Sequence, residues 1–142
     1  MNLLFLKTQE DYKKYFIEHY CNVNIFTYSG IEVKFYSDQF EHSFFESKDH
    51  KKRDKSLFSL ERAQRMPWIK ETLQNKEAEL YVGWDRDKKK YNENRRVSII
   101  TPENYVVVLN MINDKKAKFI TAYLASKTNA KKIRSAPIWE ES

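Results

Sequence analysis

The sequence contains very little cysteine, glycine and proline, with one, two and three residues respectively among 142. The lone cysteine, Cys21, cannot form an internal disulfide, which fits a reducing compartment. The two glycines, Gly30 and Gly83, are too few for a phosphate-binding loop or a dinucleotide-binding fingerprint. The sequence therefore disfavours nucleotide-dependent kinases and Rossmann oxidoreductases.

The chain also lacks a long hydrophobic run. No window is apolar for long enough to span a bilayer, and the mean hydropathy is -0.79. The short apolar run at residues 1–6 has neither a basic leader nor a small-residue cleavage site, so we expect no secretory signal. From these absences we predict a cytoplasmic protein that has no membrane partner.

Basic and aromatic side chains, in contrast, are abundant. Lys and Arg number 26 against 20 Asp and Glu, which gives a formal net charge of +6, and the chain has nine Tyr, nine Phe and three Trp. Basic clusters favour a polyanionic partner, and aromatic rings among them can stack on bases. We therefore predict RNA as the partner rather than a membrane surface. A lysine-rich composition that serves only solubility is the alternative.

Hydrophobic periodicity and turn residues divide the chain into helices followed by strands. We expect helices at 8–22, 37–47 and from 59 onward, the last interrupted at Pro67, with a β-hairpin at 23–36 and a solvated loop at 48–55. We expect strands at 79–85, 95–100, 105–109 and 117–125, and one helical turn in the tail. Short connections between successive strands predict an antiparallel meander.

The expected fold class is therefore α+β. The length of the chain favours a single domain over residues 1–142. In this domain an N-terminal helix and hairpin (1–36) precede a core (37–142) built on a four-stranded antiparallel sheet.

Among the three histidines, His42 is the strongest candidate for proton transfer. Histidine titrates near neutral pH, so it can accept or release a proton without extreme tuning. His19 and His50 have no comparable neighbouring signal, and no histidine has the ligand spacing of a standard zinc site. We therefore predict chemistry without a metal or cofactor. A packing role for His42 on its Phe-rich helix is the alternative.

The strand at 117–125 carries two further candidates, Thr121 and Tyr123. Side chains alternate between the faces of a strand, which predicts Phe119, Thr121 and Tyr123 on one face and Ile120 and Ala122 on the other. A hydroxyl and a phenol side by side could bind a phosphate. An ordinary half-solvated strand has the same pattern.

Three arginines are candidates for phosphate binding. Arg62 and Arg65 are three residues apart on a predicted helix, where they share a face and could form a fork. Pairing with nearby carboxylates such as Glu61 is the alternative. Arg96 alternates with the apolar Val97, and in the simplest strand register it approaches the face of Thr121 and Tyr123.

Taken together, these segments resemble the phage and prophage RNase-like domains of the barnase–EndoU–colicin–RelE superfamily. The resemblance spans roughly residues 40–139, and no single motif in it is diagnostic. It is carried by Phe40–Phe45, Ser59–Ile69, Leu80–Asp85, Arg95–Val97, Tyr105–Val108 and Thr121–Tyr123.

The resemblance implies a metal-independent endoribonuclease, with toxin-like relatives, that has its active site on the sheet. The ribose 2′-hydroxyl attacks the adjacent phosphate, which requires a base, an acid and cations. Matched to nuclease domains of the colicin D type, His42 is the helix-borne histidine, and Thr121 and Tyr123 match a strand Ser-x-aromatic. One departure is Gln39, three residues before the histidine, where a lysine is expected. Lys55, Lys48 or an arginine would have to replace that lysine.

Two other functions remain open from the sequence. A non-catalytic RNA-binding module would keep the basic surface without turnover, and a protein-interaction domain would make the charge incidental. The sequence does not say which RNA is the target, with transfer RNA among the candidates. It also leaves open whether an inhibitor protein is a further partner.

Overall fold

The computed structural model describes residues 1–47, 57–85, 90–91 and 95–140. Its helices are α1 (Gln9–Phe16), the π-helical turn η1 (Ile17–Cys21), α2 (Gln39–Ser43), α3 (Leu60–Gln64), α4 (Met66–Leu73) and α5 (Lys127–Arg134). Its strands are β1 (Ile25–Phe26), β2 (Glu32–Lys34), β3 (Phe45–Glu46), β4 (Leu57–Phe58), β5 (Glu79–Val82), β6 (Trp84–Asp85), β7 (Lys90–Tyr91), β8 (Arg96–Ile100), β9 (Tyr105–Met111) and β10 (Lys116–Leu124). The α+β class is confirmed.

The main sheet has six strands in the order β1-β2-β10-β9-β8-β5. Its β5, β8, β9 and β10 are antiparallel neighbours, as expected for a meander of short connections. The predicted hairpin forms between β1 and β2. It does not stand apart from the sheet, however, because β2 pairs in parallel with the first residues of β10. The sheet is therefore mixed and larger than the four strands predicted.

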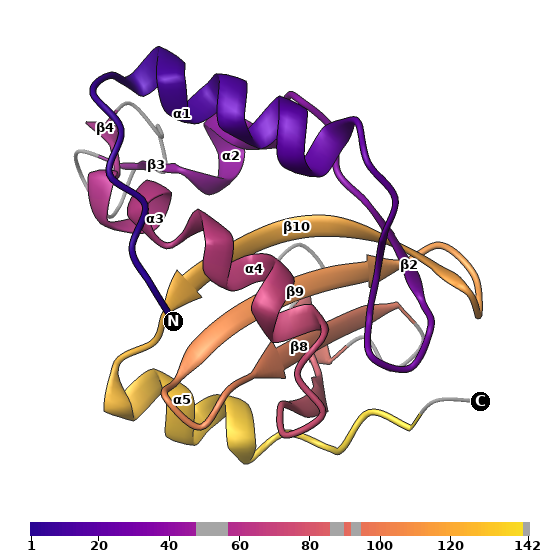
Figure 1. The fold of residues 1–142 in the computed structure, drawn as a ribbon. Coiled ribbons are helices and arrows are strands. Elements are labelled where there is room, and N and C mark those ends of the chain that lie inside the picture. The colour runs from indigo at the N-terminus through magenta and orange to yellow at the C-terminus, as the bar shows by residue number, and fades with distance from the viewer. Residues whose placement is uncertain (48–56, 86–89, 92–94, 141–142) are drawn as a thin grey trace.

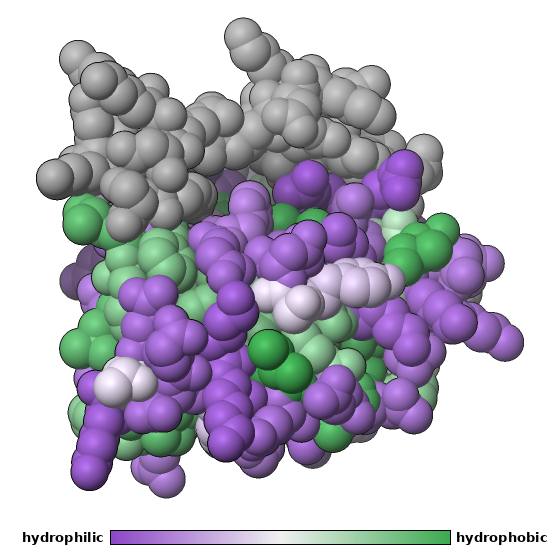
Figure 2. Space-filling model, turned by 90° about the horizontal axis from the view of Figure 1, so that it is seen from above, coloured by the Kyte–Doolittle hydropathy of each residue, from purple (hydrophilic) through white to green (hydrophobic). Residues whose placement is uncertain are grey.

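Helices cover both faces of this sheet (Figure 1). The larger core lies under α1, α2, α3 and α4, and it is rich in aromatic rings such as those of Tyr12, Phe16 and Phe119. A smaller core lies under α5, around Ile100 and Val106. Viewed from the side of α1, the surface is mainly hydrophilic with scattered small apolar patches (Figure 2). The sheet thus has α1, α2, α3 and α4 on one face and α5 on the other.

The helix boundaries follow the capping residues in the sequence. Thr8 accepts a hydrogen bond from the Asp11 amide at 3.1 Å and begins α1, and Ser59 likewise caps α3 through the Arg62 amide at 3.3 Å. Pro67 lies in the first turn of α4, where a proline is tolerated, so the predicted interruption is a restart. The predicted helix 8–22 continues past α1 as the π-helical turn η1.

Two predicted helix lengths are wrong. The helix expected to reach residue 47 ends at Ser43, because Phe45 and Glu46 leave it to pair with β4. The single helical turn expected in the tail is the longer helix α5, which Ser126 caps through the Asn129 amide at 3.1 Å. The predicted loop at 48–55, which includes His50 and Lys55, lies outside the described residues.

A β-bulge at Ile120 changes which residues of β10 share a face. Phe119 pairs with Leu109 and Thr121 pairs with Val108, so Ile120 is the extra residue. Phe119 lies in the core under α1, whereas Ile120 and Tyr123 pack against the core under α5. The predicted grouping of Phe119 with Thr121 and Tyr123 is therefore wrong.

The bulge is held by a side chain from α2. Bulging frees the Ile120 carbonyl from the ladder, and the Ser43 hydroxyl donates a hydrogen bond to that oxygen at 2.8 Å. Ser43 is buried, so this bond gives its hydroxyl the partner that a buried polar group needs. The bond also fixes the end of α2 against β10.

Stability is expected to fall above about pH 10, because two buried tyrosines must stay neutral. Burial raises the pKa of Tyr20 and of Tyr105 well above the ordinary tyrosine value. Below pH 10 the two tyrosine hydroxyls are protonated in both the folded and the unfolded chain. Above pH 10 they ionise in the unfolded chain first. Each tyrosine then lowers the free energy of unfolding by up to about 1.4 kcal/mol per pH unit. Urea unfolding over the alkaline range measures the slope.

Tyr20→Phe is expected to flatten that alkaline slope. The same variant loses the hydrogen bond from the Tyr20 hydroxyl to the Met66 carbonyl (2.6 Å), so its stability at neutral pH falls by about 1 kcal/mol. Tyr28→Phe is the control, because Tyr28 is 68% exposed and should leave the slope unchanged. Equal slopes in all three proteins would contradict the assignment.

Candidate active site

A small pocket of about 100 Å³ lies where α3, β3 and the end of β10 meet. Two of the predicted arginines and the predicted tyrosine come together in it. Its lining residues are Glu46, Glu61, Arg62, Arg65, Tyr123 and Leu124. The pocket therefore combines two guanidinium groups and a phenol with two carboxylates.

Arg62 links the three elements around this pocket. Its guanidinium carbon lies 5.6 Å from the centre of the Tyr123 ring, in cation–π contact. Its Nη1 donates to the Ser43 carbonyl at 3.3 Å, and its Nε lies 3.6 Å from Oε1 of Glu46. The guanidinium is thus oriented by contacts from α2, β3 and β10, and its side chain remains 24% exposed.

Arg65 lies deeper and is more firmly held. Its Nη1 donates to the Glu61 carbonyl at 2.9 Å and lies 3.8 Å from the Glu61 carboxylate. Its guanidinium carbon also lies 5.0 Å from the centre of the Trp68 ring. Both arginines line one pocket, as the predicted fork requires, and both also have the carboxylate neighbours that the alternative interpretation expects. Arg65 is the more structural of the two.

His42 and Thr121 are not among the residues that line this pocket. His42 lies in the last turn of α2, and the end of this helix contacts Arg62 through the Ser43 carbonyl. The His42 side chain is exposed and does not lie in the hydrophobic core. The following residue, Ser43, is bonded to the Ile120 carbonyl, so the backbone at His42 is anchored beside the bulge that precedes Thr121. Gln39, in the first turn of the same helix, has a buried Oε1 for which the described residues supply no hydrogen-bond partner.

Thr121 and Tyr123 share the face of the sheet that α5 covers. Thr121 pairs with Val108 and Tyr123 with Val106, and both of these valines belong to the core under α5. Both side chains are only partly buried. The Tyr123 hydroxyl accepts a hydrogen bond from Nδ2 of Asn129 at 3.4 Å. The two predicted residues thus lie side by side, with Arg62 over the second.

Arg96 lies on the same face as Thr121 and Tyr123, but it is two residues away on β8 from the position level with Thr121. It pairs with Asn110, whereas the pair next to Thr121 across the sheet is Val108 with Ser98. The observed register therefore places Ser98, not Arg96, in line with Thr121. Arg96 packs against Gly83, where an added Cβ would lie only 2.2 Å from the Arg96 Cγ. Lys55, the remaining predicted phosphate ligand, lies outside the described residues.

Glu46 is the pocket residue that sequence reasoning missed. It reaches Arg62 only because β3 pairs with β4, and the predicted helix continued through this segment. The other carboxylate of the pocket, Glu61, was detectable from the sequence, since it precedes its partner Arg65 by four residues. A carboxylate beside a guanidinium can serve as a general base or simply neutralise charge.

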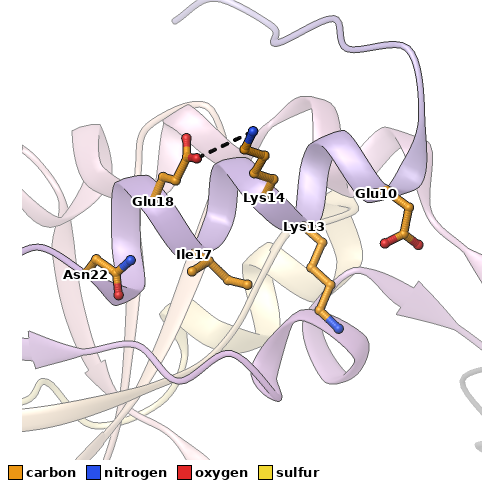
Figure 3. A pocket seen from close by; sticks show the side chains of 6 residues that line it. All are labelled: Glu10, Lys13, Lys14, Ile17, Glu18 and Asn22. Carbon is orange, nitrogen blue, oxygen red and sulfur yellow. Dashed lines mark ion pairs between the residues drawn. The ribbon is translucent and has the colours of Figure 1, made fainter.

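A second and wider depression, of about 400 Å³, lies along α1 (Figure 3). Both of its lysines pair with carboxylates. Lys13 contacts Glu41 at 2.7 Å, and Lys14 lies 3.9 Å from Glu18. The Glu41 side-chain hydrogen bond raises the pKa of Lys13. This depression collects paired surface charges, and we assign it no chemistry.

The part of the chain that the structure describes contains no group of three or more His, Cys, Asp and Glu side chains placed to hold a metal ion. Among the same residues, no helix is both long enough and apolar enough to cross a membrane. Comparison with known proteins adds no assignment, because no family model, curated protein or solved structure matches the chain.

Proposed function

We propose that the protein is a metal-independent endoribonuclease of the barnase–EndoU–colicin–RelE type that acts at the pocket of Arg62, Arg65 and Tyr123. The observation that carries the proposal is the convergence of these three side chains beside the end of α2, which bears His42. The antiparallel run of β5, β8, β9 and β10 further supports it.

In the proposed reaction, a base takes the proton of the ribose 2′-hydroxyl, and the 2′-oxygen attacks the adjacent phosphorus. The bond to the 5′-oxygen breaks as an acid protonates that oxygen, which leaves a 2′,3′-cyclic phosphate. His42 serves as base or acid. Thr121 donates a hydrogen bond to a phosphate oxygen, and Tyr123 stacks on a base or donates to the phosphate. Arg62 and Arg65 stabilise the charge on the pentacoordinate phosphorus.

One set of observations favours a non-catalytic RNA-binding module as the second candidate. Gln39 stands where the resemblance expects a lysine. Glu46 and Glu61 lie within ion-pair distance of the two arginines and partly neutralise them. Such a module would use the same pocket and the same partner without turnover.

An oligodeoxynucleotide that contains a single ribose distinguishes the two functions. With purified protein in a chelator, we expect cleavage only on the 3′ side of the ribose, and a cyclic phosphate on the 5′ fragment. The all-deoxy oligomer should remain intact, since it lacks the attacking hydroxyl. Mass spectrometry of the products identifies the new ends. Binding of both oligomers without cleavage would support the RNA-binding module and contradict the nuclease.

A further inference from the structure

Three basic side chains and one asparagine form a line across four strands on the face of the sheet that carries α5. The line lies beyond the residues that α5 covers, toward the start of β10. It consists of Lys34 on β2, Lys118 on β10, Asn110 on β9 and Arg96 on β8. We call these four residues the cationic row.

The strand register places the row on one face without ambiguity. Lys118 pairs with Lys34 on one side and with Asn110 on the other, and Asn110 pairs with Arg96. The residues next to them in each strand, such as Val33, Ala117 and Val97, are buried in the core under α1. Because strand side chains alternate, the row must point to the opposite face.

This part of the face is strongly positive. Two residues before Lys118 on β10, Lys116 pairs with Glu32 on β2. This pair adds one cation and one carboxylate beside the row. Nζ of Lys34 lies 3.3 Å from that carboxylate. Three cations on one part of the face match an anionic polymer better than a neutral ligand.

Aromatic rings flank the cations. The Lys118 ammonium lies 5.3 Å from the centre of the Tyr36 ring, and that ring is 47% exposed. Phe26, which pairs with Glu32 at the edge of the sheet, is 46% exposed. Exposed rings beside cations are the arrangement on which unpaired bases stack. The row crosses four strands, or about 14 Å, which matches roughly four steps of about 3.4 Å between stacked nucleotides.

We propose that the cationic row binds the backbone of single-stranded nucleic acid, with Tyr36 and Phe26 stacking on its bases. Lys34, Lys118 and Arg96 bind phosphates, and Asn110 donates its amide hydrogens to phosphate or base oxygens. The surface shares its partner class with the proposed function but needs none of that function's chemistry. It lies on the same face as Thr121, which is three residues after Lys118 on β10.

The test uses a fluorescein-labelled oligodeoxyuridine of about 12 nucleotides, whose anisotropy reports binding and which cannot be cleaved. The variant carries Lys34→Gln, Lys118→Gln and Arg96→Gln. We expect about tenfold or greater loss of affinity at low salt. The slope of log K against log salt should become shallower by about 2, at about 0.7 for each lost phosphate contact.

A second triple variant controls for total charge. It carries Lys14→Gln, Lys70→Gln and Lys76→Gln. These three exposed lysines lie on α1, on α4 and in the segment after α4. We expect its affinity and salt slope to stay close to those of the wild type. Equal losses in both variants, or wild-type binding by the first, would overturn the proposal.

Because Arg96 packs against Gly83, the first variant could lose its fold, so an experiment on the wild-type chain accompanies it. Titration of the same oligomer into ¹⁵N-labelled protein should shift the amide signals of Lys34, Asn110 and Lys118. Shifts confined to other elements would contradict the row. Deoxy-oligomer binding that depends on the row, in a protein that cleaves no RNA, would uphold this inference and reject the nuclease. RNA cleavage with binding independent of the row would do the reverse.

Discussion

Phe16→Ala is expected to destabilise the protein by about 3–5 kcal/mol, which is the usual cost of emptying a large aromatic site in a core. Phe16 on α1 is fully buried and connects α1 with α2, β10 and the segment after β2. The centre of its ring lies 5.5–6.3 Å from the ring centres of five other aromatic residues, Tyr20, Phe35, Phe40, Phe44 and Phe119. Small domains are stable by only about 5–15 kcal/mol, so this loss is a large share of the total.

Thermal and urea unfolding of the variant measure this loss, and the thermal midpoint should fall by about 10 °C or more. Phe5→Ala is the matched control, because Phe5 is 71% exposed. It should change stability by less than about 0.5 kcal/mol. A small effect at Phe16 would mean that the surrounding rings collapse into the space and that the core is loosely packed.

Local signals predicted the helices and strands well where one residue decides the structure. Thr8 and Ser59 begin helices because their hydroxyls accept hydrogen bonds from the backbone amides three residues further on. Pro67 sets a restart by its lack of an amide hydrogen. The hairpin turn is similar, since Gly30 has φ of 98°, which a glycine adopts without strain. In each case the cause and its effect lie within a few residues of one another.

Contacts between distant segments were not predictable in this way. The parallel pairing of Lys118 with Lys34 joins residues 84 positions apart, and no turn between them specifies it. The bulge at Ile120 depends on the hydroxyl of Ser43, which is 77 positions away. A single extra residue in a strand inverts every later side chain, so this one contact separated Phe119 from Thr121.

The candidate site shows the same division. Spacing alone placed Arg62 and Arg65 on one face of a helix, and alternation placed Thr121 with Tyr123. The approach of Arg62 to Tyr123 depends on how α3 packs against β10, and the nearby Glu46 depends on a strand pairing. The cationic row could not be found from the sequence, because its members come from four strands and only the register brings them into line.

The pocket and the row together suggest how binding and chemistry are divided on this molecule. The row lies on the part of the sheet beyond α5, and its three cations can attract a nucleic-acid strand from a distance. The pocket has a volume of only about 100 Å³, and hydrogen bonds to backbone carbonyls orient both of its arginines. A site that must stabilise a transition state needs such fixed groups, whereas a capture surface does not. Loss of the row should therefore weaken RNA binding more than it slows cleavage of bound RNA.

His42→Gln is expected to lower the rate of RNA cleavage by about 10²–10⁴-fold, which is the usual contribution of one acid–base group. Glutamine keeps the size and polarity of the side chain but cannot exchange a proton near neutral pH. The pH–rate profile should therefore lose one of its limbs along with its height. Single-turnover cleavage of the single-ribose oligomer over a range of pH measures both effects.

Two further variants separate proton transfer from other losses. His19 is an exposed histidine on η1, and its ring stacks on that of Tyr15 with 4.0 Å between the ring centres. His19→Gln should leave the pH–rate profile unchanged. Arg62→Gln should lower the rate by about 10²–10³-fold while both limbs remain, because a guanidinium stabilises charge without exchanging a proton in this range. If His42→Gln also kept both limbs, another group would be the proton carrier. The Glu46 carboxylate beside Arg62 would then be the first candidate for that role.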